Sequence, residues 1–175
     1  MIIAKEKKKN NISEYILYMW QIEDMIRAND FDIEKIRKNI IEKFDQPDVI
    51  KNEMVHWYED LISRMEKENI KEKGHLGFLN EIIRELEDLH EQLIKNTDEL
   101  DYIADYNKAK SNINDLKTRS RGTTTGDIET ALQGLYGFLL LKLQGKSINP
   151  STQDAIASIS TLISHLSYKY KEIKQ

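Results

Sequence analysis

Apolar residues recur at steps of three and four through most of the 175-residue chain, which is the period of an amphipathic α-helix. Turn-forming residues divide this pattern into helical segments over about residues 12–28, 32–44, 48–69, 78–95, 98–119, 126–144 and 150–173. Only 2 prolines and 7 glycines interrupt the chain, which favours a few long helices over many short strands. The pattern predicts an all-α protein, a single-domain helical bundle of about six to seven helices spanning residues 1–175.

Local signals fix several boundaries of this bundle. Residues 1–10 are predicted to be a flexible, lysine-rich start, and residues 119–126 are the clearest loop. Thr125 is expected to cap the helix that follows this loop. The last helix is expected to use Asn149 as its cap and Pro150 as its first helical residue.

The sixth segment is apolar almost all round. Its apolar residues are Leu132, Leu135, Tyr136, Phe138, Leu139, Leu140, Leu141 and Leu143. Such a helix belongs at the centre of a bundle or in a subunit interface. Gly134 and Gly137 suggest a face that a neighbouring backbone approaches closely. On that interpretation, Gly137→Val is expected to destabilise the fold by more than about 1 kcal/mol through overpacking.

Composition narrows the function classes. The formal net charge of -4 argues against a strongly basic nucleic-acid binder, so no nucleic-acid partner is expected. The absence of cysteine excludes disulfides, thiolate metal ligands and cysteine nucleophiles. The start of the chain does not resemble a signal peptide, and the longest apolar run is too short to cross a membrane. We therefore expect a cytoplasmic protein without a membrane partner.

Three blocks of the sequence resemble a known family. They are the opening residues 1–24, the segment Glu72-Lys73-Gly74-His75-Leu76, and Leu135-Tyr136-Gly137 with the following Leu139 to Gln144. Together they are similar to a bacterial family defined as domain of unknown function 4924. The resemblance implies an all-α bacterial protein. It brings no catalytic residue, cofactor or substrate with it.

One pair of residues suggests an enzyme. Arg84 and His90 have a spacing similar to the motif of the helical HEPN nuclease superfamily, in which an arginine and a histidine at a dimer interface act on RNA. The guanidinium would bind a phosphate and the imidazole would transfer the proton. The commoner gap is shorter, however, and Glu85, Glu87 and Asp88 between the pair would repel a phosphate backbone. The competing interpretation is a partly buried, hydrogen-bonded His90.

A metal site is a weaker alternative. Glu53…His56 and Glu87…His90 repeat the Glu-x-x-His step of di-metal helical bundles, with Glu23 or Glu129 available as further ligands. His56 is predicted to face water, which leaves Glu87, His90 and Glu23 as the remaining set. No cofactor is expected.

The break between the third and fourth segments is the best candidate for a ligand-binding loop, formed by Lys73, Gly74 and His75. Its competing interpretation is a helix stop with Gly74 as the cap. Trp20 is added to the ligand-binding candidates because it lies off the apolar face of its own helix, which suggests a contact with another element or another subunit.

The leading interpretation is a non-enzymatic interaction or scaffold protein that acts as a homo-oligomer, most simply a homodimer, or on a protein partner. The alternatives are a HEPN-like RNA-cleaving enzyme that uses Arg84 and His90, and a helical bundle that binds a small ligand or a metal.

Overall fold

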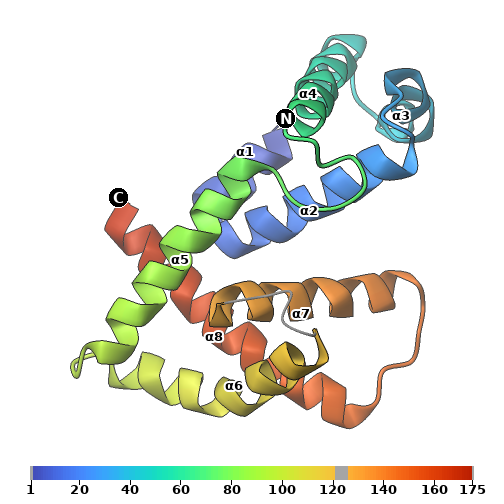
Figure 1. The fold of residues 1–175 in the computed structure, drawn as a ribbon. Coiled ribbons are helices and arrows are strands. Elements are labelled where there is room, and N and C mark those ends of the chain that lie inside the picture. The colour runs from blue at the N-terminus through green and yellow to red at the C-terminus, as the bar shows by residue number, and fades with distance from the viewer. Residues whose placement is uncertain (1, 121–125, 175) are drawn as a thin grey trace. The chain divides into compact units, whose positions relative to one another are not determined.

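A computed structural model describes residues 2–120 and 126–174. These residues contain eight α-helices, one short 3-10 helix and no strand, which confirms the predicted all-α class. The elements are α1 (Ile2–Asn10), α2 (Ile12–Ala28), α3 (Ile33–Asn39), η1 (Ile41–Lys43), α4 (Asp48–Lys67), α5 (Gly77–Lys95), α6 (Leu100–Arg119), α7 (Asp127–Leu143) and α8 (Pro150–Lys174) (Figure 1).

The helices differ from the predicted segments in two places. Residues 2–10 form α1, where the lysine run had suggested a flexible start. The segment predicted over residues 32–44 is divided at Ile40, whose backbone angles (φ -123°, ψ -62°) leave the helical region, so that α3 is followed by η1.

The chain forms two compact units. Unit 1 contains Met1–Lys9 and Glu14–Glu81, and unit 2 contains Asn10–Ser13 and Ile82–Gln175. Helices α2 and α5 each contribute residues to both units. The single domain spanning residues 1–175 stays a prediction.

The core of unit 1 is built from the apolar stripes of α2 and α4. The buried residues of these stripes include Ile16, Met19, Ile22, Ile26, Met54, Tyr58, Leu61 and Met65. Trp57 is only half-buried and meets Tyr58 edge to face, with ring centroids 5.1 Å apart. The side chain of Asp32 caps α3 by accepting hydrogen bonds from the N–H groups of Glu34 and Lys35.

In unit 2, helices α6, α7 and α8 pack against one another. Their buried residues include Tyr102, Ala109, Ile113, Ile128, Ala131, Leu132, Ile159, Leu162 and Leu166. The Asn149 side chain accepts a hydrogen bond of 2.7 Å from the N–H of Thr152, as the predicted cap requires. Thr125, the expected cap of α7, lies outside the described residues, as does most of the predicted loop, and Gly126 occupies the capping position instead.

Helix α7 is buried only along its first half. Ile128, Thr130, Ala131 and Leu132 are buried, whereas the side chains of Leu135, Tyr136 and residues 138–141 are half-buried and Leu143 is 68% exposed. The helix is therefore not at the centre of a bundle formed by the described residues.

The two glycines of α7 have different surroundings. A Cβ atom at Gly137 would meet nothing within 4 Å, whereas one at Gly134 would come within 2.6 Å of Leu116 Cδ1. The close backbone approach expected at Gly137 is absent from the described chain, so overpacking within the monomer is not a reason for Gly137→Val to destabilise it.

Among the helices of residues 2–120 and 126–174, none is long and apolar enough to cross a membrane.

A buried pair of hydroxyls gives a test of this packing. Ser13 and Ser167, each 3% exposed, share a hydrogen bond of 2.6 Å in unit 2. Ser13→Ala or Ser167→Ala should lower the free energy of unfolding by roughly 1–2 kcal/mol, because the remaining hydroxyl loses its partner. The double variant should lose clearly less than the sum of the two, as urea unfolding would measure. Additive losses would contradict the buried bond.

Candidate functional site

Three side chains of α2 are directed at the connection between α4 and α5. Trp20, Glu23 and Arg27 follow the spacing i, i+3 and i+7, which places them on one face of the helix. Each contacts the segment 70–76, although this segment lies about fifty residues away in the sequence.

Glu23 is the buried centre of this arrangement. Its side chain is 0% exposed, one carboxylate oxygen accepts a hydrogen bond of 2.9 Å from the N–H of Leu76, and the other lies 2.6 Å from Nδ1 of His75. An ionised carboxylate can only accept, so Nδ1 of His75 donates. Neutral His75 is thereby held in the tautomer whose Nε2 is an acceptor.

Trp20 covers the imidazole of His75. The two rings are stacked, with centroids 4.3 Å apart and planes inclined by 18°, and Trp20 is 1% exposed. The off-stripe position of Trp20 thus corresponds to a contact with another element of the same chain.

Arg27 holds the backbone of the connection. Its guanidinium donates to the carbonyl oxygens of Ile70 (3.1 Å) and Gly74 (2.5 Å), and it pairs with Asp24 at 2.9 Å. Gly74 has φ +98°, a conformation that side-chain-bearing residues rarely adopt. Gly74 does not cap α4, however, because the helix ends at Lys67 and Asn69, with φ +56°, is the left-handed residue that follows its C-terminus.

The structure brings together only part of the predicted ligand-binding set. Trp20 and His75 meet, with Glu23 and Arg27 added from α2, whereas Lys73 is exposed and forms no ion pair or side-chain hydrogen bond with the described residues. The arrangement resembles the carboxylate–histidine pairs that orient a general base or a metal-bound imidazole. The hydrogen bonds and the ring stacking of these side chains, however, hold residues 70–76 against α2.

A second polar cluster lies at the start of α7 in unit 2. The carboxylate of Glu87 accepts a hydrogen bond of 2.8 Å from the N–H of Glu129 and a further one from the N–H of Ile128. A Cβ atom at Gly126 would overlap this carboxylate, so any other residue there would oblige the Glu87 side chain to move. Burial raises the pKa of Glu87, and the two backbone N–H groups partly oppose that rise.

His90 lies beside this carboxylate-capped helix start and is 3% exposed. Its Nδ1 is 2.7 Å from the hydroxyl of Tyr102, and its Nε2 is 4.0 Å from a carboxylate oxygen of Asp127. Asp127 in turn accepts from the hydroxyl of Tyr106 (2.6 Å) and from the ammonium of Lys117.

The same surroundings set the ionisation of these groups. Burial lowers the pKa of His90, with Asp127 and Glu91 opposing the change and Lys117 adding to it. Burial alone would raise the pKa of Asp127, but the bonds from Lys117 and Tyr106 outweigh it and the pKa is lowered. The cluster therefore favours a neutral His90 facing an ionised Asp127.

Arg84 and His90 do not form a joint site on α5. Six residues of α-helix turn their side chains about 120° apart. Arg84 is exposed, whereas His90 is buried against Tyr102, in line with the competing interpretation of a buried, hydrogen-bonded histidine.

The weak metal set is not assembled either. Glu23 is bonded to His75 and Leu76, and Glu87 caps α7. In the part of the chain that the structure describes, no group of three or more His, Cys, Asp or Glu side chains could hold a metal ion. His56 is 79% exposed beside Glu59, as its predicted outward position requires.

The sequence analysis missed most of the partners of the histidines. Nδ1 of His165 lies 3.0 Å from Asp105, and this pair, with Ser160, Thr161 and Ser164, lines a shallow polar hollow in unit 2. Asp105 and His165 are 60 residues apart, and Glu23 and His75 are 52 apart. Local spacing rules carry no signal for pairs at such separations.

The chain belongs to the family described as "Domain of unknown function (DUF4924)", whose model matches residues 1–175. No curated protein and no solved structure shows a significant match to it.

Removing the carboxylate of Glu23 tests its role in unit 1. Glu23→Ala leaves the buried N–H of Leu76 without its acceptor, so the free energy of unfolding should fall by roughly 2–4 kcal/mol. Amide exchange at Leu76 should accelerate with it. The exposed Glu81→Gln serves as the control and should change stability by less than about 0.5 kcal/mol. Unchanged stability in Glu23→Ala would contradict the role assigned to this carboxylate.

The buried His90 predicts a pH dependence. Its pKa is lowered on folding, so below about pH 6.5 the unfolded chain binds a proton that the folded chain does not. The free energy of unfolding of the wild type, minus that of His90→Gln, should therefore decrease as the pH falls from about 6.5 and level off above it. Urea unfolding of both proteins across this range measures the difference. A difference that grows towards acid would show that His90 is stabilised in its charged form.

Proposed function

We propose that this chain works through protein contacts, as a non-enzymatic interaction or scaffold protein that forms a homodimer through α7. The observation that carries the proposal is the exposure of the most apolar helix of the chain. From Leu135 to Leu141 no residue of α7 is fully buried, and Leu143 is 68% exposed.

An exposed apolar face of this kind calls for a partner. Contiguous apolar surface costs free energy in water, and monomeric proteins keep such patches small. A groove of about 380 Å³ follows the same face and is lined mainly by apolar groups, among them Leu116, Gly134, Gly137, Phe138, Leu141 and Ile156. These residues form an apolar surface against which a second helix can pack.

The charges at the two ends of α7 favour a second copy as the occupant. The helix begins with Asp127 and Glu129 and ends with Lys142, which Lys146 follows. Two copies that cross antiparallel on a two-fold axis would align their helix dipoles favourably and would bring the first turn of each, which contains Glu129, towards the basic end of the other. Asp127 is already paired with Lys117 of its own chain. Gly137, open to a Cβ atom, would lie near that axis and allow the backbones to approach.

All four histidines have partners within the chain that orient the imidazole. Each of the four has a carboxylate or phenol of the chain within 3.0 Å of its Nδ1. The nuclease alternative would need His90 and Arg84 at one accessible surface, and they lie on different faces of α5.

A substitution at Gly137 should weaken dimerisation without destabilising the folded monomer. In Gly137→Glu the helix propensity improves and no atom obstructs the new side chain, so the monomer should become more stable by up to about 1 kcal/mol. A buried charge at the two-fold axis should weaken association at least about tenfold. Sedimentation velocity over a range of about 1–200 μM would measure the association, because an interface of one helix pair is expected to be small and weak.

The control places the same charge elsewhere in unit 2. Ser160→Glu on the exposed face of α8 should leave association unchanged. A wild-type chain that stays monomeric over the whole range, or association that Gly137→Glu does not weaken, would refute the proposal.

A further inference from the structure

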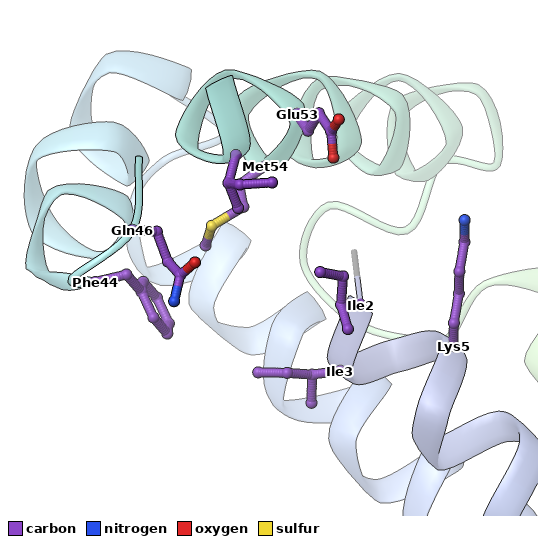
Figure 2. A pocket seen from close by; sticks show the side chains of 8 residues that line it. Ile2, Ile3, Lys5, Phe44, Gln46, Glu53 and Met54 are labelled. Atoms are coloured by element: carbon purple, nitrogen blue, oxygen red, sulfur yellow. The ribbon is translucent and has the colours of Figure 1, made fainter. Parts of the chain in front are cut away.

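Unit 1 contains a small hollow that the proposed function does not use. Its volume is about 240 Å³, and it lies between α1, the start of α4 and the chain that follows η1. Figure 2 shows Ile2 and Ile3 on one side of the hollow and Phe44 and Met54 on the other.

The wall of the hollow is apolar. Ile2, Ile3, Phe44, Ile50 and Met54 supply it, and Met54 is the most deeply buried of them at 5% exposure. Ile2 is 58% exposed and Ile3 is 38% exposed, so α1 keeps apolar surface in contact with water around the opening. A hollow of this volume accommodates one large apolar side chain, and the transfer of such a group from water into the hollow is favourable.

Two opposite charges border the apolar wall. Lys5 of α1 and Glu53 of α4 both line the hollow and are exposed. In Figure 2 they lie on the side away from Phe44. Within residues 2–120 and 126–174, neither side chain takes part in an ion pair. Within the described residues, the chain therefore presents an ammonium and a carboxylate without an ion-pair partner beside a space for one apolar group.

We propose that this hollow binds a free α-amino acid with a large apolar side chain. The apolar group enters the space between α1 and α4, the α-carboxylate pairs with the ammonium of Lys5, and the α-ammonium pairs with the carboxylate of Glu53. Ligand pockets commonly combine an apolar lining with a few polar groups that fix orientation. A ligand with one charge would leave either Lys5 or Glu53 without a partner, and the zwitterion matches both.

Calorimetric titration of the full-length chain with L-leucine, L-methionine and L-phenylalanine tests the proposal directly. At least one should bind with a dissociation constant below about 1 mM. Trp57 lies one turn from Met54 on α4 and gives a fluorescence signal for the same event. Glycine should not bind measurably. 4-Methylpentanoate and isoamylamine, which each keep one charge of leucine, should bind at least about tenfold more weakly than leucine.

Charge-reversal variants test whether Lys5 and Glu53 bind the two charged groups of the ligand. Lys5→Glu and Glu53→Lys should each weaken binding at least about tenfold, whereas the double variant, which exchanges the two charges, should recover most of the affinity. Lys9→Glu, an exposed change on α1 outside the hollow, is the control and should bind as the wild type does. Absence of binding by all three amino acids, equal binding of 4-methylpentanoate, or no effect of the single reversals would each overturn the proposal.

Discussion

Each compact unit depends on a carboxylate that accepts backbone N–H groups where the chain enters a helix. In unit 1 Glu23 of α2 accepts from Leu76, the residue before α5. In unit 2 Glu87 of α5 accepts from Ile128 and Glu129 in the first turn of α7. The first N–H groups of a helix have no partner within the helix, and the residue preceding α7 is Gly126, which has no side chain to offer. A distant carboxylate supplies the acceptor, and the positive end of the helix dipole stabilises its charge.

Other features of the structure follow from the positions of these two carboxylates. The Glu23 carboxylate also orients His75, which explains why Trp20 can stack on the imidazole although it lies off the apolar stripe of α2. The Glu87 carboxylate occupies the space of a Cβ atom at Gly126, so a larger residue there would displace the carboxylate from its present position. Burying a carboxylate is costly unless it is fully bonded, and the bonds to N–H groups and to His75 offset that cost.

The sequence was sufficient to predict the features that depend on residues close together in the chain. The three- and four-residue period located the long helices, and Asn149 with Pro150 marked the start of α8, because helix period and capping are local properties. It was insufficient for features set by distant residues. The acceptor for α7 comes from Glu87, about forty residues away, and no local pattern distinguishes this glutamate from its exposed neighbours. The apolar second half of α7 is the clearest case: its sequence fits a buried position, but its exposure depends on how α6 and α8 pack against it.

The exposed α7 face and the hollow of unit 1 are suited to different occupants. The exposed apolar face of α7, in unit 2, follows the second half of the helix from Leu135 to Leu143 and contains Gly137, which suits the contact of a second helix. The hollow of unit 1 is concave, fits one side chain, and is bordered by Lys5 and Glu53. An apolar wall alone discriminates weakly between groups of similar size, because each methylene contributes only about 0.8 kcal/mol. A ligand that removes water from Lys5 or Glu53 without pairing with its charge loses far more binding free energy. Selectivity at the hollow should therefore come from Lys5 and Glu53, whereas the occupant of α7 should be selected by its shape and apolar area.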